Sequence, residues 1–182
     1  MTPTSDLLIP VSARDHRQGS ETAPLTLVEY GDYQCPYCGE AYAIIKEAQR
    51  ELGTDLQFVF RNFPLTQTHP NAELAAEAAE AAGAMGKFWP MHDALYENQR
   101  SLGRDFVLSL ADTLGFDRER LAVALKKRRY RAQVREEFMG GVRSGVNGTP
   151  GFFINGQRYQ QAWDLESLLR ALRAAHPRRQ AG

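Results

Sequence analysis

The feature that most constrains this chain is the segment Cys35-Pro36-Tyr37-Cys38, which holds both cysteines among its 182 residues. The apolar run at 25–30 before it predicts a buried strand, and the helical period of apolar residues from Gly39 to about Leu52 predicts a helix after it. A strand that leads into a helix begun by a Cys-x-x-Cys pair is typical of redox-active thiol sites. The segment therefore predicts an α/β fold with two reactive sulfurs at one turn.

The spacing of the two cysteines has a physical reason. With Cys35 as the N-cap, Pro36 takes the first helical position, where its fixed φ suits the helix and its missing N–H loses no hydrogen bond. The N–H groups of the first turn and the helix dipole favour a thiolate there, so we expect the pKa of Cys35 to lie below that of an ordinary thiol. Cys35 is the predicted exposed nucleophile, and Cys38, one turn further on, is the predicted resolving cysteine.

The rest of the chain predicts a second strand, a block of helices and a final hairpin. Alternating apolar residues at 56–63 predict a strand parallel to the first, because a helix connects the two. Strand patterns return at 152–154, where Asn155-Gly156 predicts a hairpin turn, and a last helix follows with Asp164 as its cap. Between 64 and 145 all patterns are helical, at about 71–84, 88–98, 106–114, 117–125 and 130–142.

Four ordered motifs resemble the DsbA-like branch of the thioredoxin superfamily. They are TLVEYGDYQCPYCGE at 26–40, FRNFPL at 60–65 with HPNAELAAEAAEAAG at 69–83, KFWPMHD at 87–93 and GTPGFFING at 148–156. The resemblance implies a thioredoxin fold with an inserted all-helical subdomain. We expect the discontinuous thioredoxin-like domain at 1–63 and 146–182, and the inserted helical subdomain at 64–145.

The resemblance also implies roles for individual residues. It makes Cys35 the attacking cysteine, Cys38 its resolving partner and Glu29 a buried acid that relays the proton of Cys38. Thr149-Pro150 becomes a loop with a cis peptide bond that pairs with an extended substrate, and Pro36 and Tyr37 add substrate-binding surface. The implied activity is thiol:disulfide exchange with protein or peptide substrates, without metal or organic cofactor, by a monomer that a redox-recycling partner regenerates.

Two alternatives stay open, as does the direction of electron flow. Pro36-Tyr37 is the dipeptide typical of glutaredoxins rather than the Pro-His of the strongly oxidising members, so oxidase, reductase and isomerase activities all remain candidates. A glutathione-dependent transferase or isomerase of the same fold is one alternative, although such enzymes typically lack a second cysteine. A non-catalytic chaperone-like binding module that uses the helical block is the other.

Composition and spacing disfavour several other classes of function. The formal net charge is zero, and acidic groups over the whole chain balance the basic run at 126–131, so we expect a solvated helix face rather than a nucleic-acid site. No histidines or carboxylates stand at a metal-site spacing from the cysteines; His69 is predicted to be a helix-start residue and His92 a packing residue. Without a leader pattern or a long apolar run, we expect a cytoplasmic protein with no membrane insertion, or an extracytoplasmic one if a leader is removed.

Overall fold

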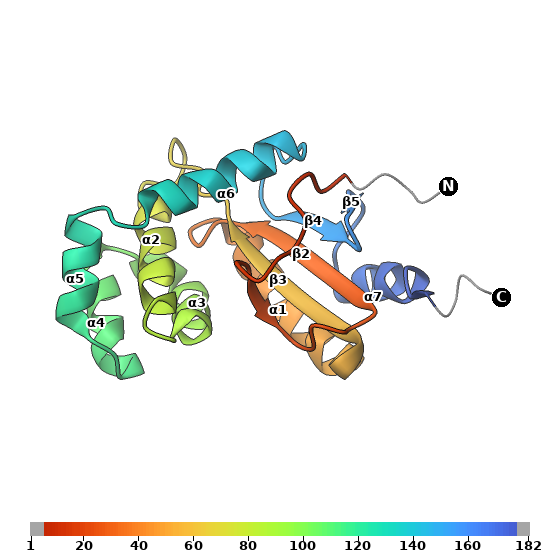
Figure 1. Cartoon of the computed structure of the whole chain (residues 1–182), viewed down its shortest axis with the longest axis horizontal. Helices are drawn as coiled ribbons and strands as arrows, with labels where there is room; N and C mark the ends of the chain where they lie inside the picture. Colours follow the sequence, from red (N-terminus) through yellow and green to blue (C-terminus); the bar gives the residue numbers. More distant parts are fainter. Residues whose placement is uncertain (1–5, 178–182) are drawn as a thin grey trace. The chain divides into compact units, whose positions relative to one another are not determined.

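The computed structural model describes residues 6–177, which form a five-stranded sheet, seven α-helices and two short 3₁₀ helices (Figure 1). The first half of the order is β1 (His16–Gln18), β2 (Leu25–Gly31), α1 (Pro36–Leu52), η1 (Gly53–Asp55), β3 (Leu56–Asn62), α2 (Ala72–Gly83) and α3 (Phe88–Glu97). The second half is η2 (Gln99–Ser101), α4 (Arg104–Leu114), α5 (Arg118–Lys126), α6 (Arg131–Arg143), β4 (Gly151–Ile154), β5 (Gln157–Tyr159) and α7 (Leu165–Ala174). The order confirms the strand, helix, helical block, hairpin and helix that the sequence predicts.

The strands lie in the order β1-β3-β2-β4-β5, so the predicted strands β2 and β3 are neighbours in the middle of the sheet. The N–H of Phe63 donates to the carbonyl of Gly31 at 2.7 Å. Since these residues stand at the carboxyl ends of β3 and β2, the two strands run parallel, as predicted. The pairings of β1 with β3, β2 with β4 and β4 with β5 are antiparallel.

The β4–β5 hairpin turns at Asn155-Gly156, as predicted. Their φ angles are +46° and +81°, and a two-residue turn that suits the twist of paired strands requires this left-handed region at both positions. The Asn155 side chain also accepts a hydrogen bond from the N–H of Thr26 at 2.8 Å. The turn is therefore fixed both by its backbone and by a contact to the start of β2.

Two aspartates cap helices, and one of them is the predicted Asp164. Asp164 accepts a hydrogen bond from the N–H of Ser167 at 3.1 Å, and Asp117 accepts one from Arg120 at 2.9 Å. The bond to Ser167 holds the pKa of the Asp164 carboxyl below its usual range. These contacts satisfy N–H groups that the first helical turn cannot pair internally, which explains where α7 and α5 begin.

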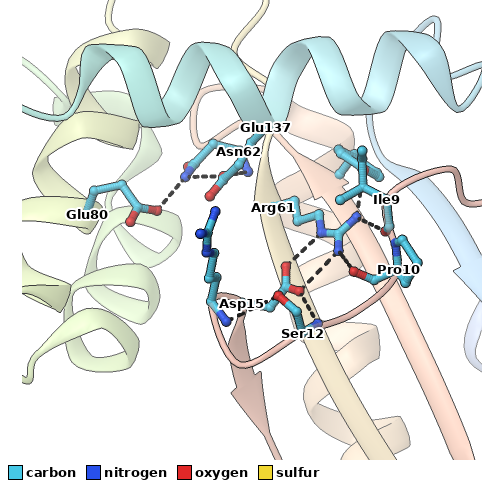
Figure 2. A network of polar contacts seen from close by, with 10 residues as sticks. Ile9, Pro10, Ser12, Asp15, Arg61, Asn62, Glu80 and Glu137 are labelled. Carbon is cyan, nitrogen blue, oxygen red and sulfur yellow. Dashed lines mark hydrogen bonds and ion pairs between the residues drawn. The ribbon is translucent and has the colours of Figure 1, made fainter.

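Strand β1 was not predicted, and a buried ion pair accounts for the path of the chain beside it. The guanidinium of Arg61 on β3 donates to both carboxylate oxygens of Asp15, at 2.8 and 3.1 Å, and to the carbonyls of Ile9 and Pro10 (Figure 2). Burial is the largest single influence on the pKa of Arg61 and lowers it, but the hydrogen bonds and charge interactions with Asp15 and Tyr30 together outweigh burial, so the net shift is upward. Arg61 thus fastens the segment before β1 to a central strand.

The chain forms two compact units. One comprises the described residues up to Tyr30, Glu40–Arg61 and those from Gly140 onward, and the other comprises Gly31–Gly39 and Asn62–Met139. The second unit holds the helices α2 to α5 together with the segment that carries both cysteines. The predicted domain boundaries, 1–63 with 146–182 and 64–145, stay a prediction.

In the helical unit, α2 packs against α3, α4 and α5 (Figure 1). The buried Glu77 of α2 accepts a hydrogen bond from Arg128 at 2.7 Å, and this bond raises the pKa of the guanidinium. Glu80 and Glu137 both accept from the side chain of Asn62 (Figure 2). The basic run at 126–131 is solvent-exposed on the whole, as predicted, but Arg128 also has this internal role.

Candidate active site

Helix α1 begins at Pro36, so Cys35 is its N-cap and Cys38 lies in its first turn, as predicted. The N–H of Gly39 donates to the carbonyl of Cys35 at 3.1 Å, which closes the first helical hydrogen bond. The two cysteines are thiols and are not joined by a disulfide. The sequence spacing therefore does place both sulfurs at one helix start.

The prediction that Cys35 is exposed is wrong. Only 4% of Cys35 is accessible, against 0% of Cys38, while Pro36 is exposed and Tyr37 is 61% accessible. The reason is local: the chain turns so that the N–H of Cys35 donates to the carbonyl of Asp32 at 3.1 Å, which brings the loop over the cysteine. Tyr37, rather than a sulfur, is the side chain that this turn presents to solvent.

Asp32 lies at the centre of this loop, and the sequence did not single it out. Its buried carboxylate accepts hydrogen bonds from the N–H of Gln34 at 2.7 Å and of Leu65 at 2.8 Å. The N–H of Asp32 points to the sulfur of Cys38 at 3.5 Å. Through Asp32, the main chain of Leu65 is connected with the turn that carries the two cysteines.

Gln99 in η2 is a second residue that sequence reasoning missed. Its side-chain amide donates to the carbonyl of Tyr33 at 2.9 Å and to that of Cys35 at 2.8 Å. The Gln99 side chain crosses the first turn of α1 at Gly39, which has no side chain of its own. A Cβ atom added to Gly39 would lie 2.8 Å from Cδ of Gln99. Nothing in the sequence identified Gln99 as the neighbour of Gly39.

Replacement of Gly39 by Ala is expected to lower the free energy of unfolding by about 1–3 kcal/mol, because Gln99 must leave its two carbonyl partners. In the Gln99→Ala background, Gly39→Ala should leave the free energy of unfolding unchanged or raise it, because alanine is a better helix former than glycine. A double-mutant cycle by denaturant unfolding measures the coupling. Strictly additive effects of the two substitutions would contradict the contact.

Tyr33, in the same loop, packs in an aromatic cluster of the helical unit. Its hydroxyl lies 3.0 Å from Nδ1 of His92, and both side chains are buried. The rings of Phe88, Trp89 and Tyr96 surround His92 at centroid distances of 5.0–5.9 Å. His92 therefore has the packing environment that the sequence predicted, and it also anchors the residue two positions before Cys35.

The other predicted site residues belong to the sheet-bearing unit. Glu29 on β2 is 1% accessible and stands opposite Phe152 of β4 in the antiparallel register. The Thr149–Pro150 peptide bond is cis, as the resemblance implied, and both residues are half-buried just before β4. The structure thus brings Cys35, Pro36, Tyr37 and Cys38 together in one unit, and Glu29 and the Thr149-Pro150 loop belong to the other.

Within residues 6–177, no three side chains of His, Cys, Asp or Glu lie close enough together to hold a metal ion. In the same part of the chain, no helix has the length and apolar character needed to cross a lipid bilayer.

Residues 12–174 match the model of the thioredoxin family. Among curated relatives, the chain is similar to the Na(+)/H(+) antiporter NhaA 1 of Salinispora arenicola, with 43% identity over 171 residues. The match covers 93% of this chain and 26% of that protein. The chain therefore spans about a quarter of the length of the antiporter-named relatives that it matches.

Two solved structures show the same fold. BdbD from Bacillus subtilis, in its oxidised form, superposes with a TM-score of 0.81 at 24% identity, over 88% of this chain and 92% of that one. The α-DsbA1 protein of Wolbachia pipientis superposes with a TM-score of 0.80 at 16% identity, over 98% of both chains. The predicted α/β fold, a thioredoxin fold with inserted helices, is confirmed.

Proposed function

The chain belongs to the thioredoxin family, with the fold of its DsbA-like members, and on this premise we propose that it is a thiol:disulfide oxidoreductase acting on proteins through Cys35 and Cys38. The observation that carries the proposal is the position of the pair at the N-terminus of α1. There the helix dipole and the N–H groups of the first turn stabilise a thiolate.

In the reducing direction, the Cys35 thiolate attacks one sulfur of a substrate disulfide, and the other substrate sulfur leaves as a thiolate. Cys38 then loses its proton and attacks the Cys35 sulfur, which releases the second substrate thiolate and leaves a Cys35–Cys38 disulfide. Two electrons pass from the pair to the substrate. In the oxidising direction the same steps run backwards, so the two sulfurs carry the electrons without metal or organic cofactor.

The substrate-binding residues that we propose are the exposed Pro36 and Tyr37 in one unit and Thr149 and Pro150 in the other. We propose that main-chain groups of the loop before β4 pair with an extended substrate segment, while Tyr37 offers an accessible ring for apolar side chains. Protein or peptide thiols and disulfides are the proposed substrates of a monomer, and a separate redox protein would return the pair to its working state.

An insulin-reduction assay and an oxidative-refolding assay together test the proposal. We expect turnover in at least one of them and loss of that turnover in Cys35→Ser. Turnover in neither, with suppression of substrate aggregation, would instead support a chaperone-like binding module. Activity only with glutathione and a small electrophile would support a transferase.

Glu29→Gln tests the proposed proton relay. Because a buried carboxylate can accept the proton that Cys38 loses, we expect release of the mixed disulfide to slow by about 10²-fold, in the usual range for a lost general base. Alkylation of Cys35 by iodoacetamide should change by less than about twofold, since that step does not need the relay. Stopped-flow release kinetics and alkylation rates provide the two measurements, and an unaltered release rate would exclude the relay.

A further inference from the structure

The carboxylate of Asp32 accepts three hydrogen bonds although it is buried. Its side chain is 0% accessible. One oxygen accepts the N–H of Gln34, and the other accepts both the N–H of Leu65 and Nδ1 of His69, the latter at 2.8 Å. Three donors around one buried carboxylate fix its position, because loss of any one leaves a desolvated charge with fewer partners.

His69 supplies the one side-chain donor in this set. Its imidazole is 17% accessible, whereas the Asp32 side chain is inaccessible, so His69 lies on the solvent side of the carboxylate. Because the carboxylate can only accept, we assign a proton to Nδ1. The N–H groups of Thr68 and His69 both donate to the carbonyl of Leu65, at 3.0 and 2.8 Å, which folds 65–69 into a tight turn around the carboxylate.

The main chain of Asp32 touches both cysteines. Its carbonyl accepts the N–H of Cys35, and its N–H points to the sulfur of Cys38 at 3.5 Å. A thiolate accepts such a hydrogen bond strongly, whereas a disulfide sulfur carries little negative charge and accepts weakly. The N–H of Asp32 therefore favours the Cys38 thiolate over both the thiol and the disulfide.

We propose that Asp32 and His69 form a positioning pair, which holds the N–H of Asp32 against the Cys38 sulfur and thereby sets the redox equilibrium and the resolving rate of the Cys35–Cys38 couple. The inference rests on the proposed thiol:disulfide function. It gives Leu65 and His69 a part in that chemistry, although they stand 33 and 37 positions after Asp32 in the chain.

Asp32→Asn tests the pair with a side chain of nearly the same shape. An amide cannot accept from all three donors, so the loop should shift and the Cys38 hydrogen bond should weaken. At a pH at which Cys38 is ionised, we expect the equilibrium constant with glutathione to move about tenfold toward the disulfide, or ~30 mV toward a more reducing couple. Resolution should slow about threefold, because a tenfold loss of thiolate is partly offset by the higher nucleophilicity of a more basic thiol.

The matched control is Asp117→Asn, the same substitution at the cap of α5, where asparagine caps equally well. It should leave the glutathione equilibrium unchanged. A wild-type equilibrium in Asp32→Asn would overturn the proposal, as would an equal shift in both variants.

A second pair of variants keeps the proposal testable if Asp32→Asn does not fold. His69→Asn retains a side-chain N–H close to the place of Nδ1, whereas His69→Ala removes it. We expect His69→Ala to shift the glutathione equilibrium about threefold in the same direction and His69→Asn to stay within about twofold of wild type, as a weakened rather than a lost hydrogen bond implies. Equal behaviour of the two variants would overturn the role of His69.

These outcomes are distinguishable from failure of the proposed function itself. If the wild-type couple forms no reversible disulfide with glutathione at any ratio, the oxidoreductase proposal fails. If the wild-type couple cycles and the substitutions at 32 and 69 leave its midpoint and resolving rate unchanged, only the positioning pair is wrong.

Discussion

Cys38→Ser is expected to accumulate mixed disulfides between Cys35 and its substrates, whereas Cys35→Ser is expected to trap none. The difference follows from position, because Cys35 caps α1 beside two exposed residues and Cys38 is fully buried one turn further on. Without Cys38, nothing within the site attacks the Cys35–substrate bond. Non-reducing gel electrophoresis with mass-spectrometric identification of the trapped cysteine measures the result.

Turnover in the insulin assay should fall by about 10³-fold or more in Cys35→Ser, which is the order of loss for removal of a covalent nucleophile. The double variant Cys35→Ser with Cys38→Ser is the control for adducts formed elsewhere, and it should form none because the chain has no other cysteine. Equal trapping by both single variants would contradict the assignment of attacking and resolving roles.

Arg61→Met is expected to lower the free energy of unfolding by about 3–5 kcal/mol, the range for breaking one side of a buried ion pair. Arg61 and Asp15 are both nearly inaccessible, at 4% and 10% of their side chains, so water cannot replace the lost guanidinium. The carbonyls of Ile9 and Pro10 would lose their donors as well. In a chain of this size the melting temperature should fall by about 6–20 °C, as measured by calorimetry.

Arg170→Met is the matched control, because Arg170 pairs with Glu166 at 2.7 Å while both side chains are mostly exposed. Such a pair contributes about 0–1 kcal/mol, so the control should melt close to wild type. The double variant Arg61→Met with Asp15→Leu should recover part of the loss, since no charge is left buried. Equal melting temperatures of Arg61→Met and Arg170→Met would show that the buried pair contributes nothing.

Local signals in the sequence predicted most of the fold, because each depends on residues close together in the chain. The helix start at Cys35-Pro36, the Asn155-Gly156 turn and the caps Asp117 and Asp164 are decided within about four residues. Strand β1 has no such signal: its three residues form a strand because they pair with β3, opposite Phe60, Val59 and Phe58. That pairing depends on the distant contact between Arg61 and Asp15.

The candidate site divides in the same way. The identity of the two cysteines follows from one motif, but their surroundings come from contacts across long separations in sequence, 37 residues for Asp32 with His69 and 64 for Cys35 with Gln99. A histidine before a proline and a glutamine after a helix both lack a local sequence pattern from which such a partner could be predicted. The accessibility of Cys35 was mispredicted for a different, local reason: the motif does not show that the N–H of Cys35 turns back to the carbonyl of Asp32.

The anchoring of Gly31–Gly39 by Leu65, His69 and Gln99 has a consequence for protein engineering. A minimal version cut back to the sheet and its helices would retain both cysteines but lose every one of these anchors. The helical segment is therefore not a removable accessory to the cysteine motif. Conversely, under the proposed function His69 is a position outside the motif at which a substitution changes the redox couple without altering either sulfur or the dipeptide between them.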